Sequence, residues 1–188
     1  MRKLTLQVQM SVDGFIAGPN GEMDWMTWNM DAELSKYITD LTDSVDSIIM
    51  GRKMAAGFVG YWQSVVVDTS NPEYDFGRKM VDKPKTIFSQ TLESLELGNS
   101  TLVTGDISHE VNKLKKQDGK DIIAYGGANF VANLIKNNLI DEYHLFINPT
   151  AIGKGMAIFN ELEQYLNLKL VKATAFECGI AVLCYQPA

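Results

Sequence analysis

The sequence predicts an α/β fold with three layers, in which a mostly parallel central sheet lies between helices and is closed by a C-terminal antiparallel hairpin. Two observations predict it. Short apolar segments alternate several times with amphipathic helical segments, which indicates parallel strands joined by right-handed crossovers. The last two strand-like segments, 168–174 and 180–185, instead follow each other through the turn Glu177-Cys178-Gly179, which favours an antiparallel hairpin.

The first strand is expected at 4–10, where apolar residues alternate with polar ones. A Ser-Val-Asp-Gly turn follows, and the loop at 18–28 then combines Gly, Pro and Asn with Met and Trp. Loops of this kind often cover ligands. From Asp31 to Leu41 apolar residues recur every three or four positions, which predicts a helix with acidic residues at its positive end.

The middle of the chain alternates between strands and helices. A short apolar strand at 47–50 stops at Gly51, and a helix is expected to begin at once with Arg52. The stretch 57–83 is the least regular part of the sequence and predicts only a short helix near 74–80. Four further apolar segments predict strands. These strands are 85–88, 101–104, 121–125 and 143–147. We expect one helix after the segment 101–104 and another after the segment 121–125.

Composition and charge limit the classes of function. The chain has 188 residues, of which 46% are hydrophobic and 21% charged, so we expect a single folded domain spanning 1–188. The net charge of −6 leaves no broad basic face, which argues against nucleic acid or an anionic membrane as main partners. Because no signal peptide and no apolar run of about 18 residues occur, the expected location is the cytoplasm.

The cysteines and histidines do not predict a metal site. Cys178 and Cys184 are the only cysteines, and they lack the C-x-x-C spacing. His109 and His144 have no metal-ligand spacing to each other or to a cysteine. We therefore expect buried free thiols and no bound metal.

Two strand-to-helix turns carry features that bind phosphate. In the first, Gly51 precedes Arg52 and Lys53, so basic side chains flank backbone N–H groups at the positive end of a helix dipole. The same segment also fits an ordinary turn with solvated basic residues. The second turn contains Gly126-Gly127 but lacks the full G-x-G-x-x-G fingerprint. Because carboxyl ends of parallel strands meet at one edge of a sheet, both turns are expected to face one dinucleotide.

Three motifs occur in the order used by dihydrofolate reductase-like proteins: 11–17 (Ser-Val-Asp-Gly-Phe-Ile-Ala), 49–52 (Ile-Met-Gly-Arg) and 125–128 (Tyr-Gly-Gly-Ala). The first motif and the pattern Pro-x-x-x-Gly-x-Gly-x-x-x-Phe at 149–159 are similar to the reductase domain of riboflavin biosynthesis and its stand-alone relatives. The resemblance covers nearly the whole chain, and it implies a dihydrofolate reductase-like fold.

The resemblance implies NADPH as the cofactor. Ala17 and Gly18 would contact the nicotinamide through backbone groups, and Arg52 would select NADPH over NADH. The residues implied to bind the cofactor are Ala17, Gly18, Gly51, Arg52, Lys53, Met54, Ser89, Gln90, Tyr125, Gly126, Gly127, Ala128, Asn129 and Phe130.

The substrate side is expected between the loop around Trp25 and the helix that begins near Asp31. Trp25 and, second to it, Trp62 are candidates to stack on a flat heterocycle. The resemblance to folate reductases implies an acid that protonates the substrate; Glu33 is the best-placed residue for this role, and Asp31 is its rival. An acid at a helix N-terminus is also common simply because it stabilises the dipole.

These features together predict an NADPH-dependent reductase that acts on a small heterocyclic or ribosylamino-pyrimidine substrate, and the resemblance favours a homodimer. The family's reaction would be that of a 5-amino-6-(5-phosphoribosylamino)uracil reductase. The alternatives are a dihydrofolate reductase, a non-catalytic NADP(H)-binding protein and a flavodoxin-like protein that binds FMN.

Overall fold

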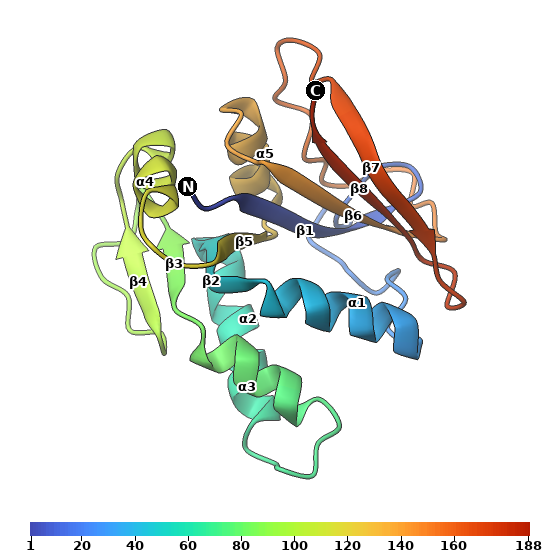
Figure 1. The fold of residues 1–188 in the computed structure, drawn as a ribbon, viewed down its shortest axis with the longest axis horizontal. Coiled ribbons are helices and arrows are strands. Elements are labelled where there is room, and N and C mark those ends of the chain that lie inside the picture. Colours follow the sequence, from blue (N-terminus) through green and yellow to red (C-terminus); the bar gives the residue numbers. More distant parts are fainter.

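Eight strands form one sheet in the computed structural model, which describes residues 1–188 (Figure 1). Their order across the sheet is β4-β3-β2-β5-β1-β6-β8-β7. The strands are β1 (Leu4–Ser11), β2 (Val45–Gly51), β3 (Lys85–Phe88), β4 (Ser100–Val103), β5 (Asp121–Tyr125), β6 (Glu142–Asn148), β7 (Leu168–Ala175) and β8 (Ala181–Pro187).

The first six strands pair in parallel, and the C-terminal hairpin is antiparallel, as the sequence predicts. β8 pairs with β6 and with β7, so the hairpin extends the sheet at one side. The flavodoxin-like alternative is wrong, because that fold has the strand order 2-1-3-4-5, whereas β1 here lies between β5 and β6.

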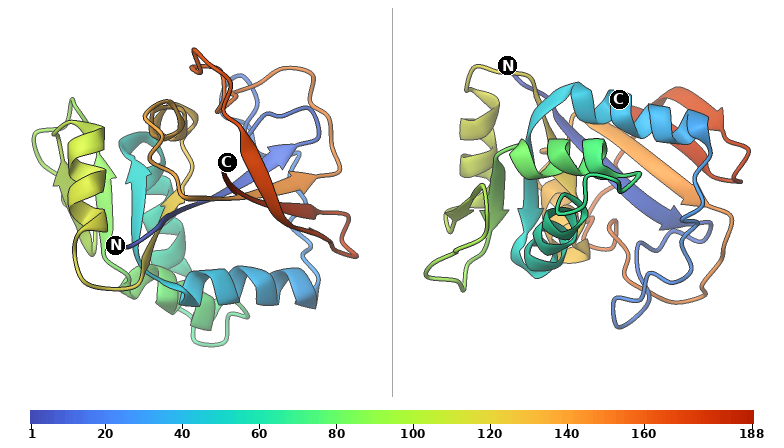
Figure 2. Two further views of the ribbon diagram at one scale, coloured as in Figure 1. Left: turned by 45° about the horizontal axis from the view of Figure 1, so that its top comes forward. Right: turned by 90° about the horizontal axis from the view of Figure 1, so that it is seen from below.

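Helices cover both faces of the sheet (Figure 2). Buried residues of α4 and α5 pack with β1 in the largest core cluster, whereas α1, α2 and α3 contribute to two smaller clusters on the other face. The three-layer arrangement is therefore confirmed. The helices are α1 (Ala32–Asp43), α2 (Arg52–Val65), α3 (Tyr74–Asp82), α4 (Ile107–Lys115) and α5 (Ala128–Lys136).

Helix α2 is longer than the sequence predicts. The stretch 57–83 is expected to be irregular apart from one short helix, but α2 continues to Val65 before α3 begins. Gly57 and Gly60 lower the helix propensity of the segment. The helix forms nevertheless, because Ala55, Val59 and Val65 bury an apolar stripe.

The longest helix has 14 residues, and no helix of the structure combines the length and apolar character that crossing a membrane requires.

Candidate cofactor and substrate site

The two glycine-marked turns contact each other at the carboxyl edge of the sheet. β2 ends at Gly51 and the adjacent parallel strand β5 ends at Tyr125, directly before Gly126. A Cβ atom on Gly51 would lie 2.8 Å from Cβ of Phe130, and one on Gly126 would lie 3.1 Å from Sδ of Met54. Each turn therefore packs against the first turn of the other's helix, which leaves no room for a side chain on Gly51.

Both helix starts at this edge lack a side-chain cap. Gly51 caps α2 with extended backbone, whereas Gly127 caps α5 with a φ of 88°, a left-handed conformation that favours glycine. The first N–H groups of each helix have no intrahelical acceptor. Arg52 and Lys53 are exposed there and form no ion pair within the protein. This arrangement suits an anion with more than one phosphate.

The segment after β3 lies beside the first turn, because Phe88 pairs with Gly51 across the sheet. Ser89 is buried, and its Oγ accepts the backbone N–H groups of Thr91 and Leu92 at 3.1 and 3.0 Å. Its side chain therefore fixes the turn, while Gln90 is exposed. The structure thus brings both of these predicted residues to the same edge.

The loop after β1 is held by a segment from the other end of the chain. Ala17 and Gly18 are buried, and Ala17 accepts the Met156 N–H at 2.8 Å. A Cβ atom on Gly155 would overlap the carbonyl oxygen of Ala17. Asp13 forms a second contact between the two segments, because its carboxylate accepts the backbone N–H of Gly153 at 2.6 Å. The two family-like motifs at 11–17 and 149–159 thus position each other.

β1 extends beyond the end of β5. The last pair between them is Gln7 with Tyr125, whereas β1 continues to Ser11 beside β6. Oε1 of Gln7 is buried and has no hydrogen-bond partner. Gln7 is not among the residues predicted from the sequence, although a glutamine within a central strand is an unusual feature that could have singled it out. An unpaired buried acceptor beside the end of β5 is suited to an N–H group of a ligand.

The two candidate acids differ in their surroundings. Asp31 is the N-cap of α1, and its carboxylate oxygens accept the N–H groups of Leu34 at 2.8 Å and of Cys178 at 2.9 Å. These hydrogen bonds lower the pKa of Asp31, so this carboxyl stays ionised at neutral pH. Glu33 is exposed in the first turn and forms no hydrogen bond or ion pair within the protein. Of the two carboxylates, only that of Glu33 has no hydrogen-bond partner within the protein.

Trp25 lies in the loop between β1 and α1, half-buried, and its indole N–H donates to the carbonyl oxygen of Glu22 at 3.1 Å. The same loop is tied to the carboxyl end of β6, because the Thr27 N–H donates to Oδ1 of Asn148 at 2.9 Å. The structure therefore keeps Trp25 on a loop at the carboxyl edge.

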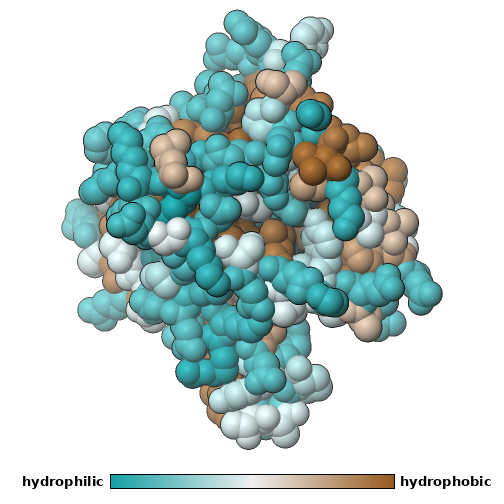
Figure 3. Space-filling view, viewed as in Figure 1, coloured by the Kyte–Doolittle hydropathy of each residue, from teal (hydrophilic) through white to brown (hydrophobic).

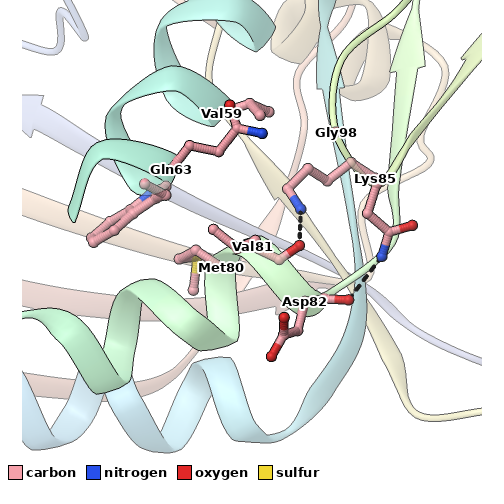
Figure 4. A pocket seen from close by; sticks show the side chains of 9 residues that line it. Val59, Gln63, Met80, Val81, Asp82, Lys85 and Gly98 are labelled. Carbon is pink, nitrogen blue, oxygen red and sulfur yellow. Dashed lines mark hydrogen bonds between the residues drawn. The ribbon is translucent and has the colours of Figure 1, made fainter. Parts of the chain in front are cut away.

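Trp62, the second aromatic candidate for the substrate site, lies apart from the other candidate residues. It is ten residues into α2, about 15 Å along the helix from the carboxyl edge. It packs edge-on against Phe76 and lines a separate pocket of about 240 Å³. Figure 4 shows this pocket, where Nζ of Lys85 donates to the carbonyl oxygen of Val81 at 3.0 Å. Lys85 begins β3, so the pocket lies at the amino end of that strand.

Residues 2–182 match the family described as the RibD C-terminal domain. The chain belongs to this family. The match confirms the resemblance to the riboflavin-biosynthesis reductase domain, and it supports an oxidoreductase with a RibD reductase-like fold.

Two proteins of Bacillus subtilis (strain 168), both uncharacterized, are similar over most of their length. YyaP is 34% identical over 187 residues, covering 98% of this chain and 95% of that protein. YwjB is 28% identical over 169 residues, covering 90% of this chain and 89% of that protein. Both alignments therefore extend over most of this chain and most of each Bacillus protein.

Solved structures share the fold. A protein of Shewanella sp. PV-4 assigned to riboflavin biosynthesis has a TM-score of 0.75 at 24% identity, with 100% of this chain and 99% of that chain covered. A diaminohydroxyphosphoribosylaminopyrimidine deaminase/5-amino-6-(5-phosphoribosylamino)uracil reductase of Thermotoga maritima has a TM-score of 0.70 at 15% identity. The alignment covers 100% of this chain and 57% of the longer Thermotoga chain. These similarities confirm the dihydrofolate reductase-like α/β fold expected from the sequence.

Proposed function

We propose that this protein is an NADPH-dependent reductase that transfers hydride to a small heterocyclic substrate of the ribosylamino-pyrimidine class. One observation carries the proposal: the glycine turns after β2 and β5 touch each other and present two uncapped helix starts at one edge of the sheet. Family membership supports the same reading, as does the shared fold with the Thermotoga protein, whose two named activities include a 5-amino-6-(5-phosphoribosylamino)uracil reductase.

The residues at this edge fit a phosphorylated dinucleotide. The first-turn N–H groups of α2 and α5 would bind the two central phosphates. The absence of side chains at Gly51 and Gly126 lets the two turns pack closely enough to face one ligand. Arg52 and Lys53 would bind the adenosine 2′-phosphate, since a guanidinium matches phosphate geometry. Ala17 and Gly18 would position the nicotinamide, which supplies the hydride when bound.

On the substrate side, the chain offers groups for a flat polar ring. Gln7 supplies a buried acceptor for a ring N–H, and Trp25 supplies an aromatic surface at the carboxyl edge. Glu33 would supply a proton, because its carboxyl is exposed while Asp31 is held by two backbone N–H groups. The main task of the protein is then to align the substrate with the cofactor and to exclude water.

A second candidate is a non-catalytic NADP(H)-binding protein. The observation that favours it is that neither acid is built into a buried catalytic arrangement: Asp31 serves as a helix cap and Glu33 is exposed. Such a protein would bind the cofactor without using it.

The decisive experiment follows NADPH absorbance during incubation with a ribosylamino-pyrimidine, with dihydrofolate and without substrate. The proposal predicts oxidation that depends on the pyrimidine and slows when Glu33 is replaced by Gln. Faster turnover with dihydrofolate would instead identify a folate reductase. Tight NADPH binding with no turnover on either compound would establish the non-catalytic alternative.

The protein is also proposed to form a homodimer through β7. This strand is the last of the sheet, so one of its edges has no partner strand. Leu170 and Val171 are about half exposed there, and Figure 3 shows apolar surface over this strand. Light scattering should give the mass of a dimer for the native chain and of a monomer for Leu170→Glu. Val67→Glu, on an exposed residue after α2, should remain dimeric, and a monomeric native chain would refute the proposal.

A further inference from the structure

Three metal-ligating side chains meet under α1, in the amino-terminal half of β6. Glu142 and His144 occupy alternate positions of β6, and Cys184 lies directly opposite His144 on β8. Because alternate residues share one face of a strand and paired residues lie side by side, the sheet itself brings the three together. One ligand atom from each residue lies within 4.8 Å of the other two, and His144 and Cys184 are buried.

Both neighbouring groups converge on the same nitrogen of His144. Oε1 of Glu142 lies 2.8 Å from Nε2, and Sγ of Cys184 lies 3.9 Å from the same atom. One ring N–H can serve only one of them well, and 3.9 Å is a poor distance for a hydrogen bond. The buried thiol is therefore left with a weak partner.

The other ring nitrogen of His144, Nδ1, has a hydrogen-bond partner of its own, as is usual for histidines in metal sites. Oη of Tyr37, on α1, lies 2.6 Å from Nδ1 of His144. In metal sites the non-ligating ring nitrogen of a histidine donates to an oxygen acceptor, which fixes the tautomer and leaves the other lone pair for the metal. A tyrosine hydroxyl can accept such a hydrogen bond. Tyr37 thus orients Nε2 toward the carboxylate and the thiol.

We propose that Glu142, His144 and Cys184 form a binding site for a divalent, thiophilic cation of the Zn²⁺ type. Nitrogen, oxygen and sulfur are the ligand atoms that Zn²⁺ takes in proteins, and tetrahedral coordination places N and O about 3.3 Å apart and N and S about 3.6 Å apart. The observed distances of 2.8 and 3.9 Å lie on either side of these values, so small rotations of the side chains suffice.

The charges of the three ligands match this ion, although Lys3 and Lys172 also lie beside the cluster. A carboxylate, a thiolate and a neutral imidazole carry two negative charges, which a divalent cation neutralises. The second carboxylate oxygen of Glu142 is already oriented, because it accepts the Nε2 amide of Gln186 at 3.0 Å and lies 3.7 Å from Nζ of Lys3. Three protein ligands leave the fourth tetrahedral position for water.

The site shares no residue with the proposed cofactor edge, although His144 pairs with Gln7 across β1 and β6. It lies near the start of β6, whereas the glycine turns lie at the carboxyl ends of β2 and β5. A bound ion would cross-link β6 and β8, and the hydrogen bond of Tyr37 would connect this cross-link to α1. No metal-ligand spacing marks these residues in the sequence, because they meet across a strand pair and not along a motif.

Cobalt titration of the full-length protein tests the proposal. The thiolate ligand predicts a sulfur-to-cobalt charge-transfer absorption that saturates at one equivalent. Cys184→Ser should abolish this band, whereas Cys178→Ser is the matched control and should retain it, since these are the only cysteines. Tyr37→Phe keeps all three ligands and should weaken Co²⁺ affinity about 10–100-fold.

A second readout does not depend on the thiol. Zn²⁺ should raise the thermal unfolding temperature of the native chain and of Cys178→Ser but not that of Glu142→Gln, which retains the shape of the side chain. No charge-transfer band at stoichiometric Co²⁺, or a band that survives Cys184→Ser, would overturn the proposal. Loss of NADPH binding with an intact cobalt band would count against the cofactor edge alone.

Discussion

Among single residues, Arg52 is the side chain on which the choice of cofactor depends. It lies exposed at the start of α2 without an ion-pair partner, beside N–H groups that suit phosphate. Arg52→Ala should weaken NADPH binding about 10–100-fold, because a charge-assisted hydrogen bond contributes roughly 1.5–3 kcal/mol. NADH binding should change little. Fluorescence titration of both cofactors measures the difference.

The matched control for Arg52→Ala is Arg78→Ala, which removes a guanidinium that pairs with Asp82 on α3. It should leave both affinities unchanged. Equal losses of NADPH and NADH affinity in Arg52→Ala would contradict the placement of the 2′-phosphate.

Asp31 and Glu33 should separate into a structural and a catalytic role. Asp31→Ala should lower the unfolding temperature, since the N–H groups of Leu34 and Cys178 lose their acceptor. The pKa of Asp31 is lowered in the folded protein. Its contribution to stability is therefore present above pH 3.8, its ordinary pKa, and is lost as the pH falls through the pKa of the folded state. Thermal scans should therefore show that the unfolding temperatures of Asp31→Ala and of the native chain differ less at strongly acidic pH than at neutral pH.

Glu33→Gln is the counterpart of that change and should slow turnover while the unfolding temperature stays unchanged. A variant at Glu33 with full turnover would exclude it as the proton donor. Stability that is unaffected by Asp31→Ala would exclude the capping role.

Among the elements, α2 begins at a tightly packed turn and continues as a helix with space for a larger side chain at Gly57. Gly51→Ala should destabilise the protein by about 1–3 kcal/mol, because the new Cβ would lie 2.8 Å from Cβ of Phe130. Gly57→Ala should instead stabilise it by about 0.5–1 kcal/mol, since this glycine is helical and nothing lies within 4 Å of a Cβ there. Denaturant unfolding measures both. Similar effects of the two substitutions would contradict the contact between the turns.

The elements also show what the sequence can and cannot predict. The strands and the helix starting at Asp31 follow from apolar periodicity, and the two glycine turns follow from strands that end in glycine. The second half of α2 is missed because Gly57 and Gly60 disfavour a helix in isolation, while tertiary packing of Val59 and Val65 stabilises it.

The missing parts of the site depend on strand order and register. Gln7 lies beside both Tyr125 and His144, and Cys184 lies opposite His144, through pairings between distant segments of the chain. Periodicity assigns each of these residues to a strand face but does not identify its neighbour on the next strand. Trp62 shows the same limit, because the sequence does not indicate that it lies ten residues along α2 from the turn at Gly51.

At the scale of the whole molecule, Lys85 links stability to pH. The residue is 2% exposed, and burial lowers its pKa from 10.5 to about 8. Between these values the unfolded chain binds the proton that the folded chain has released, so the free energy of unfolding should rise with pH from about 8 to 10.5. Relative to Lys85→Met, the native chain should gain stability across this window in denaturant titrations. A difference in free energy of unfolding between the native chain and Lys85→Met that stays constant with pH would contradict this role of Lys85.

The central claim is that the turns after β2 and β5 bind one cofactor together, and amide NMR tests it most directly. During titration with NADP⁺, the backbone N–H signals of 51–54 and 126–130 should shift together and saturate at one shared dissociation constant. Shifts confined to one turn, or different constants for the two, would contradict the claim.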